Sequence, residues 1–289
     1  MALARAGFAI ACALFLTSSA GAAGKNNLKA QAWALLRTGV ADENTEHRAT
    51  AVRVLSLLPG EPDAVLMACD ALHDEKPEVR AAAAMALGQL GDKRMIPELK
   101  EALADKEIRV VMAVAHSLLL LKDESAYEVY YAILTGERKG KGLVEEQIDT
   151  LKDPKKMAMM GFEEGIGFVP FAGIGYSAVK TIVKDDSSPV RSAAARVLGE
   201  DPDPDAAQTL AEIAIGDKSE LVRAAALESL ARRDDPKMID KIAPALSDQK
   251  DIVAYTAAAV IIRLSTMGAG PARTKSGAAA PAERPHPGG

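Results

Sequence analysis

The stretch Asp74-Glu-Lys-Pro-Glu-Val-Arg80-Ala-Ala-Ala-Ala-Met-Ala-Leu87-Gly-Gln-Leu90 combines an aspartate, a Val-Arg pair and an alanine-rich run that ends in leucine. From Val79 onward its apolar residues recur at i, i+3, i+4, i+7, i+8 and i+11, which places them on one face of a helix. Small alanine side chains let neighbouring helices approach closely, and leucines fill the remaining gaps. The stretch therefore predicts a tightly packed, alanine-rich helix.

The same arrangement recurs along the chain. Its aspartate and arginine positions are Asp42 with Arg48, Asp74 with Arg80, Asp105 with Arg109, Asp185 with Arg191, Asp217 with Arg223, and Asp248 with Ala254 in place of the arginine. The spacings between successive arginine positions are 32, 29, 82, 32 and 31 residues. A period near 31 predicts stacked units, none of which buries its apolar face alone.

A second helix is expected before each copy, so that the unit is a helical hairpin. The clearest of these helices are predicted at residues 62–72, 95–104, 206–215 and 238–246. The fold class predicted from these units is all-α. We expect a right-handed α-solenoid of about seven hairpins with an irregular central repeat.

These residues resemble HEAT-like repeats, in the short bacterial form grouped with the phycobilisome-lyase-type HEAT proteins. The aspartate, the Val-Arg pair and the alanine-rich helix ending in Leu-Gly carry the resemblance, which covers roughly residues 28–267 apart from a central interruption. The period is shorter than the usual HEAT period of about 40–47 residues. The resemblance implies a stack whose second helices line an extended concave surface for extended partners.

The recurring aspartates and arginines suggest either a ligand-binding ladder or a structural one. An aspartate before a helix can cap it or hold the turn, and an arginine fork can pair with that aspartate or with the one in the next repeat. We interpret them as a structural ladder, which comprises Asp74, Arg80, Asp105, Arg109, Asp185, Arg191, Asp217 and Arg223.

The two ends of the chain differ from the repeats. Residues 1–23 read as a signal peptide, with a basic start at Arg5, an apolar run from Ala6 to Leu16, and small residues that predict cleavage near Ala22. The apolar run is too short to span a bilayer. We therefore expect a periplasmic or secreted protein. Residues 268–289 are mostly alanine, glycine and proline and predict a disordered tail.

Composition argues against several function classes. The chain carries 35 basic and 40 acidic residues, a formal charge of −5, which disfavours a nucleic-acid binder. No two histidines stand at metal-ligand spacing, and no catalytic motif was found, so we expect neither an enzyme nor a cofactor. Cys69 falls in an apolar helical pattern and is interpreted as a small buried hydrophobe. His116 takes the position of Leu87 in the repeat and is expected to be a buried, hydrogen-bonded core histidine.

The repeat breaks in the middle of the chain. We divide the mature protein into N-terminal repeats at 24–135, an irregular central repeat with an insertion at 136–184, and C-terminal repeats at 185–267. Residues 124–134 predict a first helix. Its apolar side is expected to carry Tyr127, Tyr130, Tyr131 and Leu134.

The insertion, residues 161–176, is rich in glycine and phenylalanine. Four interpretations compete: a nucleotide loop, which lacks the strand it requires; a membrane-inserting hairpin, which is too short to span; a partner-binding loop; and a plug that covers apolar surface where the repeat is broken. The candidate partner-binding or plug residues are Phe162, Phe168, Phe171 and Tyr176.

Together these features favour an exported, non-catalytic scaffold that binds another protein of unknown identity. Two alternatives stay open. One is a lyase-like or other ligand-binding protein of the HEAT type, and the other is a peripheral membrane protein that attaches through the insertion.

Overall fold

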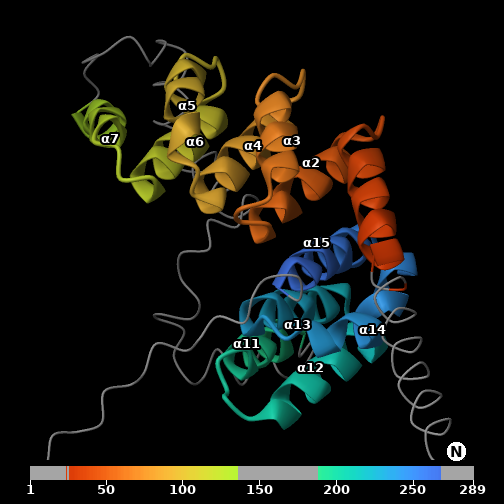
Figure 1. Cartoon of the computed structure of the whole chain (residues 1–289). Helices are drawn as coiled ribbons and strands as arrows, with labels where there is room; N and C mark the ends of the chain where they lie inside the picture. The colour runs from red at the N-terminus through yellow and green to blue at the C-terminus, as the bar shows by residue number, and fades with distance from the viewer. Residues whose placement is uncertain (1–23, 25, 136–187, 268–289) are drawn as a thin grey trace, which may run out of the picture.

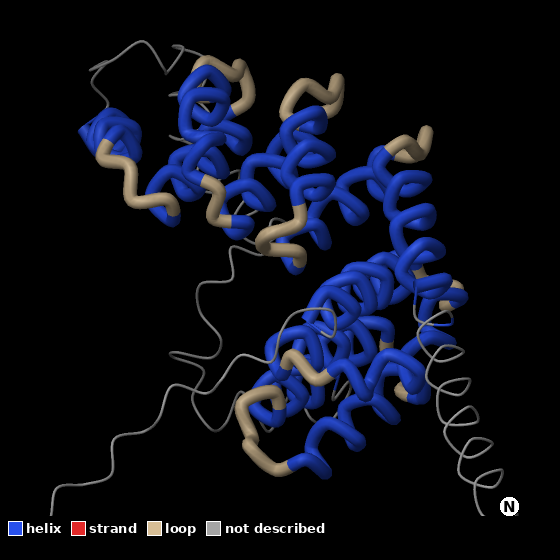
Figure 2. The backbone as a smooth tube through the Cα atoms, viewed as in Figure 1, coloured by secondary structure: helices blue, strands red, loops and turns tan. Residues whose placement is uncertain are grey.

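The computed structural model describes residues 24, 26–135 and 188–267 (Figure 1). Within these ranges the chain forms helices joined by short loops, without strands (Figure 2). The first helix spans residues 26–40. The α-helices that follow are α2 Thr45–Val54, α3 Pro62–Ala71, α4 Pro77–Leu90, α5 Ile96–Ala102, α6 Ile108–Leu120, α7 Ser125–Thr135, α11 Ser188–Leu198, α12 Pro204–Gly216, α13 Glu220–Arg233, α14 Ile239–Ile242 and α15 Asp251–Met267. The 3-10 helices are η1 Leu55–Leu57, η2 Lys93–Met95, η3 Pro236–Met238 and η4 Ala243–Ser247.

Helix boundaries follow from local chemistry, as α4 shows. Pro77 occupies its first turn, where the missing amide costs nothing, and Lys76 before it is extended. The helix ends where Gly91 adopts a left-handed φ of 77° and its amide donates to the Leu87 carbonyl. A glycine reaches this conformation without steric cost.

The helices pair into hairpins, as predicted. Five hairpins are complete within the described residues: helix 26–40 with α2, α3 with α4, α5 with α6, α12 with α13, and α14 with α15. In the C-terminal half, α12 and α14 lie on the outer side, while α13 and α15 lie between them and the N-terminal half (Figure 1). The all-α solenoid is confirmed in this arrangement.

The stacking order differs from the chain order. Second helices pack side by side in the pairs α11–α13, α13–α15, α2–α4 and α4–α6, and α15 also packs against α2 (Figure 1). The last described repeat therefore stacks on the first. We call this contact, made by α15 with α2 and with helix 26–40, the seam. The spatial order is α11, α13, α15, α2, α4, α6, so that the two halves meet at the seam.

One hydrophobic core runs through both halves. It combines many alanines with a few large side chains, among them Leu36, Leu87, Leu230 and Ile261, all essentially fully buried. Residues 253–262 of α15 are buried without interruption, so every face of this helix is covered. The seam therefore buries apolar surface, the main stabilising contribution in folding, as the other helix contacts do.

The first helix of the last repeat is shorter than expected. Residues 238–246 predict one helix, but the structure divides the region into η3, α14 and η4. Pro244 lies in the first turn of η4 and has no amide to donate to a carbonyl one turn earlier. The backbone therefore tightens into 3-10 geometry after Ile242.

The aromatic face of α7 was assigned wrongly. Tyr127 and Tyr131 are 53% and 65% exposed and Leu134 is 83% exposed, while Tyr130 is half-buried. The buried face instead carries Ala126, Val129 and Ala132, of which the last two cluster with residues of α6. These smaller residues recur at helical spacing too, and they let α7 approach α6 more closely than the tyrosines would.

The register of the α6 copy also needs correction. Asp105 accepts the Glu107 amide just as Asp74 accepts the Lys76 amide, so the two aspartates are equivalent. Counting from Asp105, the equivalent of Leu87 is Leu118, which is fully buried, and not His116, which is half-buried. Arg109 likewise stands two residues before the position that Arg80 occupies.

No described helix is both long and apolar enough to cross a membrane. The predicted signal peptide, the predicted disordered tail and the glycine- and phenylalanine-rich insertion lie outside the described residues, and so do Asp185, Phe162, Phe168, Phe171 and Tyr176.

Candidate interaction surface and the arginine–aspartate ladder

Arginine forks join successive repeats along one edge of the stack. Each fork donates through Nε and Nη2 to the two carboxylate oxygens of the aspartate in the next repeat. The donor–acceptor distances are 2.9 and 3.0 Å for Arg48–Asp74, 2.6 and 2.9 Å for Arg80–Asp105, 3.2 and 3.1 Å for Arg191–Asp217, and 2.8 and 2.8 Å for Arg223–Asp248. We call each of these two-bond contacts a rung. Charge assistance and fixed geometry make such forks stronger than single hydrogen bonds.

Arg48, Arg80 and Arg223 also hold the turn of their own repeat through Nη1. Nη1 of Arg80 donates to the backbone carbonyls of Asp74, at 2.9 Å, and Glu75, at 3.2 Å. Asp105, which receives the fork, accepts the Glu107 amide at 2.8 Å as well. The arginine therefore ties the turn of one repeat to the turn of the next, which is a stabilising role.

Asp74, Asp217 and Asp248, which each accept a rung, have lowered pKa values. Burial alone would raise the pKa of Asp74, but hydrogen bonds from Arg48 and from the Lys76 amide outweigh it and hold the pKa below its ordinary value. The pKa of Asp248 is lowered against burial in the same way by Arg223 and the Lys250 amide. In Asp217, burial is again outweighed, here by the Ser219 amide and Arg191.

These pKa directions predict acid sensitivity. A carboxylate whose folded pKa lies below its unfolded pKa adds stability above the unfolded value, and this stability is lost as pH falls through the folded value. We expect the urea midpoint of unfolding to drop on acidification from about pH 5 to about pH 3. In Asp74→Asn, which keeps a side-chain oxygen for the Lys76 amide, the drop should be smaller. An identical drop in the two proteins would contradict the prediction.

A stripe of uncovered side chains runs along the second helices. It occupies the positions 4, 11 and 15 residues after each repeat aspartate, which share one helix face because seven and eleven residues are close to whole numbers of turns. Its members are Glu46, Arg53 and Leu57; Glu78, Met85 and Gln89; Arg109, His116 and Leu120; Pro189, Arg196 and Glu200; Leu221, Glu228 and Arg232; and Ile252, Ala259 and Arg263. All are exposed or half-buried except Ala259.

The stripe carries charges of both signs, and some of them pair between neighbouring helices. Arg109 approaches Glu78 of the neighbouring helix at 3.3 Å, Arg232 approaches Glu200 at 3.5 Å, and Arg196 approaches Glu228 at 3.8 Å. Burial raises the pKa of Glu228, although the two arginines oppose the shift. Exposed pairs of this kind contribute little to folding stability. They present a surface of mixed charge.

The stripe continues across the seam. Nη1 of Arg263, on α15, donates to the carbonyl of Leu57, the next stripe residue in space, at 3.3 Å. The sequence predicted that second helices line a binding surface, but it did not single out these residues. The stripe residues could have been recognised because their three positions are polar or variable among the repeats. This pattern becomes visible only when the positions of the α6 repeat are counted from Asp105.

We also considered Cys69 as a nucleophile and the described side chains as metal ligands. Burial raises the pKa of Cys69, with smaller contributions from Glu98 and Asp70, so the thiol is protonated at neutral pH and is a poor nucleophile. The residues that the structure describes contain no cluster of histidine, cysteine and carboxylate side chains arranged to hold a metal.

The repeats of this chain match a known protein family. The model of HEAT repeats matches residues 33–119, 67–138 and 177–262 and thus covers both halves of the stack. The chain is a HEAT-repeat protein. Among proteins of curated function none matches this HEAT-repeat chain.

Two solved structures show distant similarity to this HEAT-repeat protein. One is human deoxyhypusine hydroxylase in complex with glycerol, at 18% identity over 84% of this chain and 99% of that chain, with a TM-score of 0.33. The other is the complex of CpcE and CpcF of phycocyanin lyase from Nostoc, at 22% identity over 71% of this chain and 78% of that chain, with a TM-score of 0.32. Neither likeness is close enough to bear on function.

Proposed function

We propose that this HEAT-repeat protein is an exported, non-catalytic scaffold that binds another protein along the stripe. The stripe carries the proposal, because it is an uncovered surface that repeats at matched positions on successive helices and continues over the seam. A partner that follows it meets the same three positions on each repeat. Repeat proteins use such extended surfaces to bind extended segments of other proteins.

The charge of the stripe indicates the kind of partner. The stripe carries both arginines and glutamates, and a polyanion such as nucleic acid would meet Glu46, Glu78 and Glu200 as well as the arginines. A protein segment of mixed charge can place opposite charges against both signs, which favours the correct partner and register. Stripe residues of neighbouring helices already form ion pairs with one another. A bound partner would replace these solvent-accessible pairs with its own, and it would not have to desolvate a buried charge.

The proposal is tested by capture from an envelope extract with two matched charge-reversal variants. The stripe variant combines Arg53→Glu on α2 with Arg232→Glu on α13. The control combines Lys93→Glu and Lys237→Glu, which are exposed residues of the 3-10 helices that open the first helices of their hairpins. All four positions are exposed, so we expect stability to change by less than about 0.5 kcal/mol per substitution.

We expect wild type and control to retain one stoichiometric partner that the stripe variant loses. Equal capture by all three proteins would contradict the proposed surface. A tightly bound pigment, nucleotide or metal in the purified protein would contradict the scaffold function. Export is tested separately by the mass of the protein from a cell fraction, where we expect a mature chain that begins near residue 23; an uncleaved chain in the cytosol would contradict it.

A further inference from the structure

The seam lacks the rung that joins the other second-helix neighbours described here. Rungs connect α2 to α4, α4 to α6, α11 to α13 and α13 to α15. At the seam, the arginine position of α15 is Ala254, which is buried and has nothing to donate. Asp42 is the aspartate that such an arginine would reach. The stack therefore has an acceptor at this place without its usual donor.

A histidine takes the place of the missing rung. The residue before the rung position is valine in the other copies, at Val79, Val110, Val190, Val222 and Val253, but His47 in the first repeat. Its Nδ1 lies 3.3 Å from Asp42, and its Nε2 lies 3.1 Å from Asp251 at the start of α15. The side chain of His47 is 40% exposed, against 11% for the rung arginines Arg48 and Arg80. An exposed pair contributes less stability than a buried fork.

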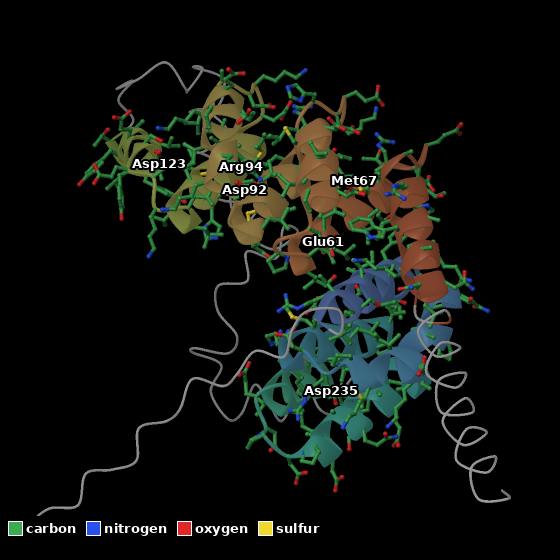
Figure 3. The ribbon with its side chains drawn as sticks, in the orientation of Figure 1. Glu61, Met67, Asp92, Arg94, Asp123 and Asp235 are labelled. Carbon is green, nitrogen blue, oxygen red and sulfur yellow. The ribbon has the colours of Figure 1, made fainter. Side chains whose placement is uncertain are left out.

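The rest of the seam combines close apolar packing with polar contacts at one end. A Cβ added to Gly39 would lie 2.7 Å from Cζ of Tyr255 and 2.8 Å from Cβ of Ala51, so Tyr255 and Ala51 meet where the glycine leaves space. At the other end, Thr266 donates to Glu61 at 2.6 Å and Lys29 pairs with Glu61 at 3.1 Å. Glu61 lies at the edge of the N-terminal half that faces α15 (Figure 3).

From this pattern we infer that the stack opens at the seam, and that the two half-stacks part there as folded units. A linear array of repeats separates first at the interface with the weakest coupling between neighbours. Each half keeps its internal rungs when the seam opens, and the chain still joins the halves through residues 136–187.

Thiol labelling of the full-length protein tests the opening. Cys69 is first replaced by alanine, and a single cysteine is then introduced by Ala51→Cys, at the seam, or by Ala83→Cys, at the equivalent position of α4. The two alanines are fully buried, and each stands three residues after its rung arginine. Global unfolding exposes both cysteines, whereas opening of the seam exposes only the first. We expect the cysteine at 51 to react at least about tenfold faster.

Supplying the missing rung should close the seam. When Ala254→Arg is added, an arginine can reach Asp42, and labelling at 51 should slow toward the rate at 83. The converse variant, His47→Val, restores the residue of the other repeats and removes the bridge between Asp42 and Asp251. It should accelerate labelling at 51 and leave labelling at 83 unchanged.

Each result decides the inference. Equal labelling rates at 51 and 83 in the parent protein would overturn it, as would a His47→Val variant that accelerates labelling at both positions alike. If Ala254→Arg does not fold, the His47→Val comparison still separates opening of the seam from general loss of stability.

Discussion

Replacing Arg80 by methionine should destabilise the protein by about 3 kcal/mol, the lower end of the range for breaking a buried ion pair. The Arg80 and Asp105 side chains are each 11% exposed, so little water reaches the carboxylate when the fork is removed. The carbonyls of Asp74 and Glu75 lose their donor in the same substitution. Methionine retains much of the arginine's aliphatic length, which limits the part of the loss that comes from packing. Urea unfolding at pH 7 measures the effect.

The control for this prediction is Arg94→Met. Arg94 pairs with Asp92 at 2.6 Å, as short as any rung bond, but its side chain is 80% exposed (Figure 3). We expect a loss of less than about 1 kcal/mol, because exposed ion pairs contribute little. A comparable loss in the two variants would show that distance rather than burial sets the contribution of these pairs. In Asp105→Asn, which keeps an oxygen for the Glu107 amide, the loss should come from the rung alone.

The hairpins could be read from the sequence because each depends on local signals. A run such as Val79 to Leu90 carries its own periodicity, and prolines such as Pro62 and Pro77 mark where helices begin. Family comparison confirmed the HEAT assignment that these signals suggested. The assignment failed where the sequence allowed two alignments of one repeat. Arg109 was aligned with the rung arginines, although it lies two residues before their position when the repeat is counted from Asp105.

The seam could not be predicted in this way, because periodicity shows which units stack but not which ends meet. A chain of repeats is expected to stack in chain order, and α15 on α2 departs from that order. Two signals were nevertheless present. Ala254 replaces the rung arginine and His47 replaces the usual valine, and each looks like an isolated exception until the structure brings them to one contact. Two departures from a repeat pattern can therefore indicate a contact between the repeats that carry them.

Helices α4 and α6 approach each other closely at Gly88. Gly88 lies on α4, and a Cβ added to it would meet Cα, Cβ and Oγ of Ser117 at 2.7 Å. The first of these atoms is backbone and cannot rotate away. Ser117 is fully buried, and its hydroxyl donates to the Ala84 carbonyl at 2.7 Å and is also 2.8 Å from the Ala113 carbonyl. A methyl group at this position must separate the two helices, and separation stretches a buried hydrogen bond between them.

Gly88→Ala should therefore destabilise the protein by about 1–3 kcal/mol, the usual cost of overpacking a tight core. Helix propensity acts in the opposite direction, since alanine is favoured over glycine by up to about 1 kcal/mol within a helix. Gly216→Ala isolates that opposing contribution. It lies at the end of α12, where an added Cβ meets nothing within 4 Å, and the substitution should be neutral or slightly stabilising. The calorimetric melting temperature should fall in Gly88→Ala, by about 2–4 °C for each kcal/mol, and should stay the same or rise slightly in Gly216→Ala. If Gly88→Ala melts at or above the wild-type temperature, the α4–α6 contact is more adaptable than its geometry indicates.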